Sequence, residues 1–542
     1  MAELDPYSSV SRDDGVKRRG LLHSSAVVSS ATMLSRVLGL VRDVVLAGLV
    51  GATSNADAFF VAFKIPNFLR RLFAEGAFAQ AFVPVLSETR EQGGREAVKA
   101  LVDRVAGVLG GSLLLLTTLT IIASPLVAVV FAPGFSRDAA KLALTADLIK
   151  ITFPYLFLIS MTGFAGGILN SYGRFAVPAF TPVLLNMSLI GAAVFVAPMM
   201  DEPVYALALG VMVAGMMQLL FQLPALQGIG LVPRPRWDTR HEGVRRILKL
   251  MVPALFGVSV SQINLLLDTV LASLLPTGSV SWLYYSDRLT ELPLGVFAIA
   301  IATVILPALA SQKARAEQNG DNSEFSNTLN WALSAVLLIA LPATAALAIL
   351  AEPILVTLFQ YGEFTGRDVS MAGVSLRAYT LGLTAFMLIK VLAPGFYARQ
   401  DMRTPVRIGI IAMVANMILN PLFIFPLMWQ FDVGHAGLAL ATSVSAWLNA
   451  LLLWRGLRRQ AVLLPTSNGP SWLILRLGIA VGLMSVALLA LSPSVEWWLA
   501  QSVGQRIWAM SGLVALGAAS YLLALFAVGI RPRQLRTPSS TF

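Results

Sequence analysis

The 542-residue sequence contains no cysteine, three histidines and few charged side chains. Without cysteine the chain has no disulfide, no thiolate metal ligand and no thiol nucleophile. His23, His241 and His435 lie at segment ends or in loops, and their spacing does not fit a metal site. Charged residues make up 13% of the chain, too few for the solvated surface of a soluble protein of this length. These absences exclude a soluble multidomain protein.

The hydrophobic residues, 56% of the chain, occur in runs of about 18–30 residues separated by short polar gaps. A membrane-spanning helix needs about 20 mostly apolar residues. The runs are continuous rather than alternating, which excludes a membrane β-barrel. The sequence therefore predicts an all-α integral membrane protein with fourteen transmembrane helices. These are expected near residues 24–51, 57–88, 98–130, 140–172, 178–199, 203–229, 242–274, 282–311, 326–350, 368–399, 405–428, 434–457, 471–493 and 504–530.

Lysine and arginine are distributed unevenly between alternate loops. One set of loops is rich in them, whereas the other set, "GATSN", "MMDEP", "LLPTGS", "QFDVGH" and "SPSVEWW", contains none. Cytoplasmic loops collect Lys and Arg, so both termini are expected to be cytoplasmic. The exceptions in or beside the bare loops are Arg137, Lys141, Arg367 and Arg506. Most of the net charge of +11 is thus an orientation signal, and no nucleic-acid partner is predicted.

A weak internal repeat relates the stretches that begin at Ser35 and Ser261, about 226 residues apart. Each runs from a serine through a helix with an aspartate, a short Gly/Ser/Thr loop and a second helix with two aromatics, charges and a proline. A duplicated transporter fits this pattern. The predicted organisation is a disordered cytoplasmic tail at 1–22, an N-lobe of helices 1–6 at 23–230, a C-lobe of helices 7–12 at 231–460, C-terminal helices 13–14 at 461–531 and a cytoplasmic tail at 532–542.

The first, second and eighth predicted spans contain the charged residues that bear most on function. A charge at bilayer depth costs at least about 2.5–3.5 kcal/mol and normally faces a cavity or a partner. Internal ion pairs or snorkelling would account for some of these side chains, Lys150 and Lys390 above all. Guanidinium groups offer a planar fork suited to phosphate, so the excess of arginine favours an anion-binding wall inside a transporter cavity. The charges are Arg36 and Asp43 on the first helix, Asp57, Lys64, Arg70, Arg71 and Glu75 on the second, and Asp287, Arg288 and Glu291 on the eighth.

Pro66 interrupts the second helix and is expected to kink it, because proline removes one backbone hydrogen bond. A kink would rotate the part of the helix that follows. A helical wheel therefore cannot decide whether Arg70 or Arg71 faces the predicted cavity.

Several long motifs closely resemble the MurJ/MviN lipid II flippase family of the multidrug/oligosaccharidyl-lipid/polysaccharide (MOP) exporter superfamily. The resemblance extends from residue 24 to about residue 530. It implies two pseudo-symmetric six-helix lobes around a central cavity, plus two C-terminal helices, in a bacterial inner-membrane protein. The motifs are "TMLSRVLGLVRD", "ADAFFVAFKIPNFLRRLFAEGAFAQAFVPVLSE", "ITFPYLFLIS", "LLNMSLIG", "GVSVSQINLLLDTVLAS", "SWLYYSDRL" and "KVLAPGFYARQD".

The resemblance also implies a substrate and a mode of action. The substrate is undecaprenyl-pyrophosphate-linked disaccharide-pentapeptide, lipid II, which such proteins move from the cytoplasmic to the periplasmic leaflet for peptidoglycan synthesis and cell-wall biogenesis. Membrane lipids and cell-wall synthesis proteins are the further partners it suggests. The helices near 471–530 would form walls of an apolar groove for the polyprenyl tail.

Site residues follow from the resemblance at matching positions. No catalytic residue and no organic cofactor are expected, and the coupling is assigned either to a sodium ion or to the membrane potential. The residues are Arg36, Arg42, Lys64, Arg70 and Arg288 for substrate binding, Asp57, Asp287 and Glu291 for gating or charge pairing, and Asp268, Asn416, Asn420 and Thr442 for a sodium site. Asp57 is further expected to meet Arg288 or its neighbours when the outer gate is closed.

Other functions remain open at this point. An exporter of another polyprenyl-linked glycan or of a small molecule in the same superfamily is the nearest alternative. A membrane glycosyltransferase would want paired acids for a metal or for acid–base chemistry, and the loops contain neither these nor a soluble catalytic domain. A channel is the weakest alternative, because no repeated filter sequence is present.

Overall fold

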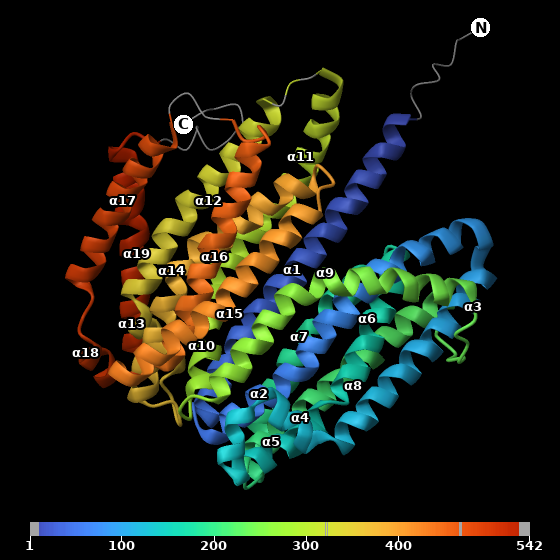
Figure 1. Cartoon of the computed structure of the whole chain (residues 1–542), viewed down its shortest axis with the longest axis horizontal. Coiled ribbons are helices and arrows are strands. Elements are labelled where there is room, and N and C mark those ends of the chain that lie inside the picture. The colour runs from blue at the N-terminus through green and yellow to red at the C-terminus, as the bar shows by residue number, and fades with distance from the viewer. Residues whose placement is uncertain (1–9, 320, 322, 465–468, 531–542) are drawn as a thin grey trace. The chain divides into compact units, whose positions relative to one another are not determined.

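The computed structural model describes residues 10–319, 321, 323–464 and 469–530, and it is helical throughout this part, with no strand (Figure 1). The all-α prediction is confirmed. Helix α1 begins at Val10, inside the segment predicted as a tail, and the predicted tail at 532–542 lies outside the described residues.

Two compact units divide the chain. The first comprises residues 1–50 and 58–262, and the second comprises residues 51–57 and 263–542. The chain crosses between the units at three points: at the end of α1, inside α2 and inside α9. Helices α2 and α9 therefore contribute to each unit. The lobe boundaries predicted from the sequence, at 230 and 460, stay predictions.

The first unit is built from the helices up to the first part of α9. Their bounds are α1 (Val10–Val50), α2 (Ser54–Leu69), the π-helix η1 (Arg70–Ala77), α3 (Phe78–Ile122), α4 (Ser124–Phe131), the 3-10 helix η2 (Pro133–Arg137), α5 (Ala139–Thr152), α6 (Tyr155–Ser171), α7 (Ala176–Gly191), the π-helix η3 (Ala192–Val196), the 3-10 helix η4 (Ala197–Met199), α8 (Pro203–Gly228) and α9 (Glu242–Ser273). Gly94 breaks α3 into two pieces, since its φ is +66°.

The second unit contains the remaining helices. Their bounds are α10 (Ser279–Pro293), the π-helix η5 (Leu294–Ala298), α11 (Ile299–Asn319), α12 (Ser323–Ile349), α13 (Ala351–Phe359), α14 (Gly366–Tyr397), α15 (Arg403–Phe431), α16 (Gly434–Arg459), α17 (Gly469–Leu491), α18 (Val495–Ala500) and α19 (Val503–Ala527).

Ten helical segments among the described residues are long and apolar enough to cross a membrane. Helices α1, α2, α9 and α10 fall outside these ten, and they contain most of the charged residues on which the predicted site depends. The predicted count of fourteen spans therefore stays a prediction.

The core of the first unit lies among α3, α6 and α8. The rings of Phe78 and Phe82 stack at 5.1 Å, and the ring of Phe164 from α6 lies 5.0 Å from that of Phe82. Helix α7 packs against both α1 and α8. The aromatic spacing of four residues on α3 thus places two rings on the face that meets α6.

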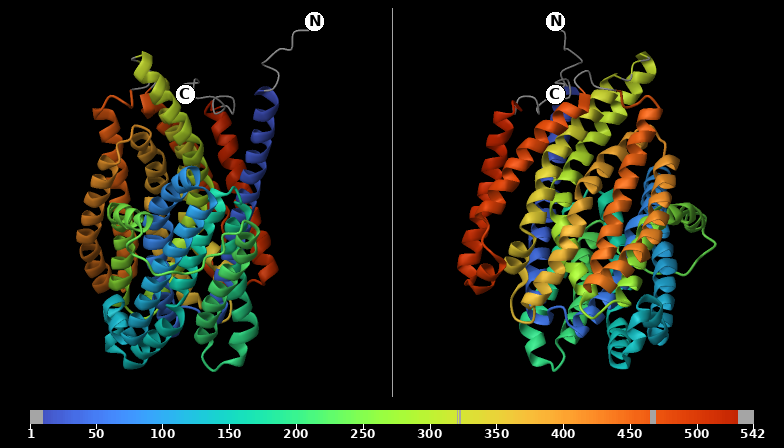
Figure 2. Two further views of the ribbon diagram at one scale, coloured as in Figure 1. Left: turned by 90° about the vertical axis from the view of Figure 1, so that its right-hand side faces the viewer. Right: turned by 60° about the vertical axis from the view of Figure 1, so that its left-hand side comes forward.

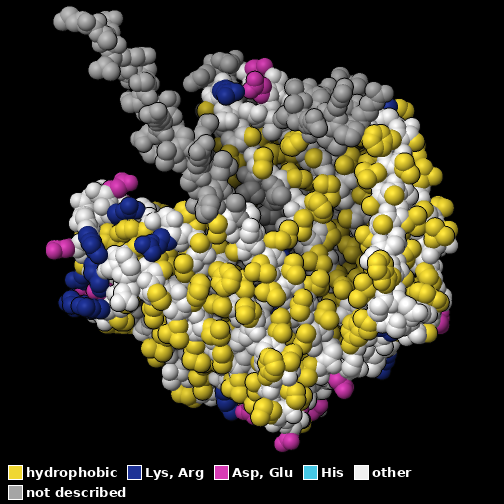
Figure 3. Space-filling model, turned by 180° about the vertical axis from the view of Figure 1, so that it is seen from behind, with side chains coloured by type: hydrophobic (Ala, Val, Ile, Leu, Met, Phe, Trp, Pro, Cys, Tyr) yellow, Lys and Arg dark blue, Asp and Glu magenta, His cyan; other side chains and the backbone are white. Residues whose placement is uncertain are grey.

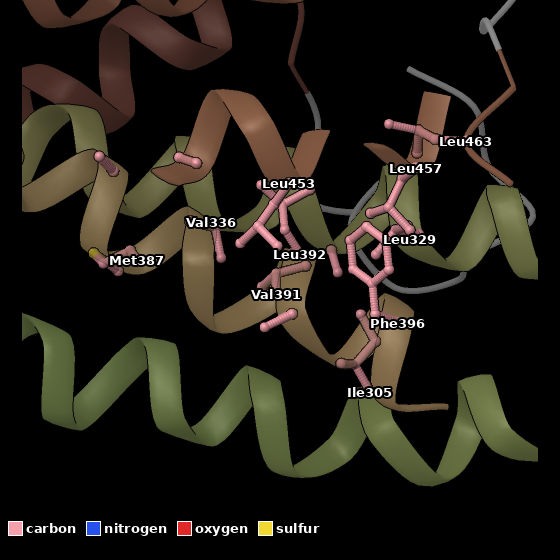
Figure 4. Packing of buried hydrophobic residues seen from close by; sticks show 14 of the residues in the cluster. Ile305, Leu329, Val336, Met387, Val391, Leu392, Phe396, Leu453, Leu457 and Leu463 are labelled. Atoms are coloured by element: carbon pink, nitrogen blue, oxygen red, sulfur yellow. The ribbon is translucent and has the colours of Figure 1, made fainter. Parts of the chain in front are cut away.

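The core of the second unit lies among α12, α14 and α16. In Figure 4 the side chains of Val336, Leu392, Leu453 and Phe396 converge from these helices, and all four are fully or almost fully buried. Gly382 of α14 leaves no room for a side chain, because a Cβ would lie 2.7 Å from Ser443 of α16. This close approach brings α14 and α16 into extensive contact.

The C-terminal helices α17 and α19 form a pair that packs on α12, the red ribbons in Figure 2. The hydroxyl of Tyr521 donates a hydrogen bond to the carbonyl oxygen of Leu338 in α12 at 2.7 Å. At the other end, the guanidinium of Arg506 is buried and donates to the carbonyl oxygens of Trp498, Leu499, Val356 and Gln360. Arg506 thus caps the C-terminal ends of both α13 and α18.

The α8–α9 linker, residues 229–241, lies on α3. The backbone amide of Arg234 donates to the Asp103 carboxylate at 2.7 Å, and the amide of Arg236 donates to the Asp103 carbonyl at 2.9 Å. Arg104 donates to the Asp238 carboxylate at 3.0 Å, and this hydrogen bond holds the pKa of Asp238 below its usual value. The linker is therefore fixed to the first unit.

Hydrophobic side chains cover most of the described surface on the face shown in Figure 3, and charged side chains gather near its edges. Ile122, Val304 and Leu523 are 75%, 69% and 69% exposed, an arrangement that water would not favour. The surface is that of an integral membrane protein.

Candidate functional site

Pro66 of α2 and the π-helix that follows it set the position of Arg70, the first residue of η1. Proline has no backbone N–H, so the carbonyl oxygen of Ala62, four residues earlier, lacks its usual helical donor. The buried hydroxyl of Thr152 in α5 donates to this oxygen at 3.2 Å. The π-helix η1 begins at Arg70, directly after the end of α2 at Leu69. In this geometry Arg70 is half-buried and Arg71 is exposed.

The second unit repeats this arrangement. Helix α10 ends at Pro293, and the π-helix η5 follows at once. The order helix, proline, π-turn is therefore present in both units at the separation found in the sequence. The internal repeat is thus one of structure as well as of sequence.

Arg42 and Asp43 of α1 form an ion pair, and Arg42 also donates a hydrogen bond to Asn186 of α7. Nε and Nη2 of Arg42 donate to Oδ1 of Asp43 at 2.9 and 2.6 Å, and Nη1 donates to Oδ1 of Asn186 at 3.1 Å. All three side chains are buried. Arg36, two turns earlier on α1, is half-buried. Arg42 is thus held inside the first unit, next to the helical face that carries Arg36.

Asp57, at the start of α2, belongs to the second unit and is 1% exposed. Its Oδ2 accepts a hydrogen bond from the backbone amide of Gly278 at 2.8 Å. Its Oδ1 accepts from the amide and the hydroxyl of Ser281 at 3.0 and 2.7 Å. These partners lie at the start of α10, the helix that carries Arg288, and about two turns before that residue. The sequence analysis expected Asp57 to meet Arg288 or its neighbours.

Arg288 of α10 pairs with Glu291, one turn further on, at 2.8 Å. Its guanidinium also lies 5.1 Å from the centre of the Tyr284 ring. Arg288, Asp287 and Lys64 of α2 are all half-buried. Since Arg36 and Arg70 belong to the first unit and Arg288 to the second, their meeting in one cavity stays a prediction.

The four residues proposed as a sodium site come together in the second unit. Nδ2 of Asn420 donates to Oδ1 of Asp268 at 3.1 Å and to Oδ1 of Asn416 at 3.0 Å. Nδ2 of Asn416 lies 3.4 Å from the Thr442 hydroxyl and donates to it. Oδ1 of Asn420 is buried without a hydrogen-bond partner. Oxygen ligands of this kind suit a hard cation. No cluster of three His, Asp or Glu side chains is present in the described part of the chain.

A network at the start of α10 was not predicted from the sequence. The indole N–H of Trp282 donates to Asp368 at 2.8 Å, and Asp368 also accepts from the amide and the hydroxyl of Thr365 at 2.8 Å. The ring of His435 lies 4.9 Å from that of Trp282, and its Nδ1 lies 2.7 Å from the Ser375 hydroxyl. The signal for Asp368 was present as a capping box that begins at Thr365.

The fold places the chain among membrane transporters. An inward-facing multidrug resistance MATE family transporter of the MOP superfamily aligns with 81% of this chain and 98% of its own length, at a TM-score of 0.62 and 16% identity. A structure of the lipid II flippase MurJ in an inward closed conformation aligns better, with a TM-score of 0.76 and 26% identity over 92% of this chain and 98% of that one. The chain is therefore a helical membrane transporter with the MOP fold.

Sequence comparison narrows the class. The family model described as lipid II flippase MurJ matches residues 46–530. The probable lipid II flippase MurJ of Vibrio cholerae is 49% identical over 95% of this chain and 98% of its own length. That of Haemophilus influenzae is 48% identical over 93% and 99%. The chain belongs to the MurJ lipid II flippase family. The prediction of a transporter rather than an enzyme is confirmed by this membership.

Proposed function

We propose that this protein moves lipid II from the cytoplasmic to the periplasmic leaflet of the inner membrane by alternating access. The observation that supports this most strongly is the 49% identity to a probable lipid II flippase along 95% of the chain. Both termini are cytoplasmic in this proposal, as the loop charges indicate. Cell-wall synthesis proteins and membrane lipids are its neighbours, and nucleic acid has no part.

The pyrophosphate is bound by Arg36, Arg70 and Arg288, with Lys64 and Arg42 adding positive charge. All three arginines are half-buried. Placing such charges at bilayer depth is costly, so a charged ligand or a water-filled cavity has to compensate. A guanidinium binds phosphate oxygens through two parallel hydrogen bonds, which gives the site geometric selectivity.

Gating involves the acids near these cations. Asp57 stabilises a closed outer gate through the start of α10, and Asp287 and Glu291 compensate the charge of Arg288 when no substrate is bound. Rocking of the lobes would break the Asp57 contacts and re-form them in each cycle.

Coupling to sodium is supported by a difference between the repeats. Asp43 and Asp268 occupy equivalent positions, 225 residues apart. The residue before Asp43 is Arg42, which is ion-paired with it, whereas the residue before Asp268 is Leu267. A sodium ion held by Asp268, Asn416, Asn420 and Thr442 would be bound through oxygen atoms, beside a carboxylate that no arginine directly precedes in the sequence. The membrane potential acting on the arginines is the alternative driving force.

The polyprenyl tail is too long for a polar cavity and requires an apolar groove. Helices α17 and α19, which pack against α12, present exposed side chains such as Leu483, Val486 and Leu522. These helices are proposed as walls of that groove.

Leaflet-specific labelling of lipid-linked precursors after depletion of the protein tests the proposal. A flippase defect traps lipid II in the cytoplasmic leaflet without reducing its synthesis. A defect in synthesis would change the total precursor pool instead. Normal lipid II distribution together with a trapped second polyprenyl-linked glycan would favour the alternative exporter.

A further inference from the structure

We propose that Asn186 of α7 is a positioning residue for lipid II binding. It fixes the rotation of α1 about its own axis and thereby the direction in which Arg36 points. This inference rests on the proposed function, because it concerns the same pyrophosphate site.

The Asn186 side chain hydrogen-bonds to two positions of α1 that lie two turns apart. Its Nδ2 donates to the Ser35 carbonyl at 2.8 Å, and its Oδ1 accepts from Arg42 at 3.1 Å. Between them lies Gly39, where an added Cβ would be 3.7 Å from the Asn186 amide nitrogen. Ser35, Gly39 and Arg42 are spaced by four and three residues, so they form one stripe along the helix. The Asn186 amide therefore holds α1 at more than one position along the same face of the helix.

Arg36 lies beside this stripe. It is seven residues from Asp43, so the two share a face, and Asp43 is held by Arg42, which is in turn held by Asn186. A chain of hydrogen bonds thus runs from α7 to the face that bears Arg36.

Apolar packing does little to hold the other side of α1. Met33 and Val37 are 53% and 54% exposed, and Val41 is 43% exposed. Exposed apolar side chains make few contacts with the rest of the protein, so they do little to prevent rotation of α1 about its axis. Asn186 is 5% exposed, and its hydrogen bonds therefore restrain the rotation of this part of α1.

The second unit also has an asparagine against its aspartate-bearing helix, although this one contacts the aspartate itself. Asn420 of α15 binds Asp268, the counterpart of Asp43, at 3.1 Å. Helices α7 and α15 each precede the last helix of their repeat. An asparagine amide placed against the aspartate-bearing helix is thus a feature of both repeats, which argues against a chance contact in the first.

The experiment measures lipid II binding and thermal unfolding of the full-length protein in nanodiscs. Asn186→Leu removes both hydrogen bonds at similar volume, and Asn186→Asp keeps an acceptor for Arg42 but loses the donor to Ser35. Ser188→Ala is the matched control, because it removes a 2.7 Å hydrogen bond from the same helix to the Gly210 carbonyl in α8, away from α1.

Asn186→Leu is expected to raise the Kd for lipid II about tenfold, which corresponds to one lost hydrogen-bonding arrangement. Ser188→Ala should lower Tm to a similar extent and leave the Kd within about twofold. Arg36→Ala combined with Asn186→Leu should bind no more weakly than Arg36→Ala alone, since Asn186 acts through Arg36. Asn186→Asp carries the same test if Asn186→Leu does not fold.

Two negative results have different meanings. If Arg36→Ala weakens binding but the Asn186 variants do not, or if the effects of Arg36 and Asn186 simply add, the positioning role is wrong and the pyrophosphate site stands. If Arg36→Ala leaves the Kd unchanged, the pyrophosphate site itself is wrong, and the role of Asn186 is overturned with it.

Discussion

The carboxylate of Asp57 caps the N-terminus of α10, with its Oδ2 accepting the backbone amide of Gly278 at 2.8 Å. A negative charge at this end of a helix is stabilised by the helix dipole. Gly278 adopts φ +97°, and a Cβ there would lie 2.7 Å from the Trp282 ring and 3.0 Å from the Ala52 carbonyl. The close approach of the segment before α2 to α10 therefore depends on a glycine.

Removing the charge at Asp57 should loosen this contact. Asp57→Asn loses the interaction with the helix dipole, worth up to about 2 kcal/mol in a buried setting. Ser279 is fully buried beside the contact, so a cysteine introduced there reports its opening. Labelling of Ser279→Cys by an impermeant thiol reagent should become about tenfold faster in the Asp57→Asn background. Thr277→Cys, at an exposed position, should label equally in both backgrounds, and an unchanged Ser279 rate would refute the capping role.

Replacing the three proposed pyrophosphate-binding arginines by lysine should impair lipid II flipping. Arg36→Lys, Arg70→Lys and Arg288→Lys each keep the charge but lose the planar fork that binds two phosphate oxygens. Flipping by each variant in proteoliposomes should fall about tenfold or more. Arg71→Lys, at an exposed position in the same π-helix as Arg70, is the control and should retain transport. Normal flipping by all three lysine variants would mean that net positive charge alone suffices.

Sodium should stabilise the protein specifically. A ligand at about 100 times its Kd adds roughly 2.7 kcal/mol to the stability of the folded state. Tm measured in sodium chloride should therefore exceed Tm in potassium or choline chloride, and Asp268→Asn should abolish the difference. Leu267→Arg should abolish it as well, by supplying the cation that Arg42 supplies in the first unit. Ser443→Ala, next to Thr442 but hydrogen-bonded to α14, should retain it.

An equal Tm in all three salts would contradict the sodium site. The membrane potential would then be the remaining driving force of the proposal. Flipping should in that case depend on an imposed potential and be insensitive to the cation used.

Orientation can be read by cysteine labelling in a chain that has no native cysteine. Thr53 and Thr277 are exposed in the loops before α2 and α10, and Thr239 is exposed in the α8–α9 linker. Cysteines at Thr53 and Thr277 should react with an impermeant reagent in intact spheroplasts, whereas one at Thr239 should react only after lysis. The reverse pattern would invert the proposed topology.

Arg506 should hold the C-terminal helix pair to the rest of the second unit. Arg506→Gln leaves several buried carbonyl oxygens without a donor and should cost about 2 kcal/mol or more. Hydrogen exchange of α17 and α19 should speed up while α14 and α16 stay protected. Arg476→Gln, on an arginine that stacks on the Trp472 ring, is a control that should have little effect on exchange. Uniform destabilisation of the whole unit would contradict a local anchoring role.

The membrane fold was predictable because hydropathy and loop charge act over the whole chain. Some basic residues lie in or beside loops that otherwise contain no Lys or Arg. The contacts that accommodate them form only in the folded chain and cannot be read from hydropathy or loop charge. Lys141 is buried with its ammonium 4.2 Å from the Phe135 ring, and Arg506 is bound by carbonyl oxygens. Both cations are compensated by neighbours that are adjacent only in the folded chain.

The site was predicted unevenly for similar reasons. Asp268 and Asn420 are 152 residues apart, and only the family resemblance brought them together before the structure did. The role of Asn186 was not predicted, because a single amide in an apolar run forms no periodic pattern that would indicate a site. The choice between Arg70 and Arg71 depended on a π-helix, where the regular turn of 100° per residue no longer holds.

The α8–α9 linker has a consequence for biosynthesis. Asp103 precedes Arg234 by 131 residues, so its carboxylate leaves the ribosome well before the backbone amide that it binds. In the folded structure the same carboxylate also pairs with Lys99, four residues earlier on the same helix. Gly107 lets the linker settle directly on the helix, since a Cβ there would lie 2.1 Å from the Arg236 carbonyl oxygen. The contact between Asp103 and Arg234 can therefore form only after the whole segment from α3 to the linker has been translated, which makes it a late step in the folding of the first unit.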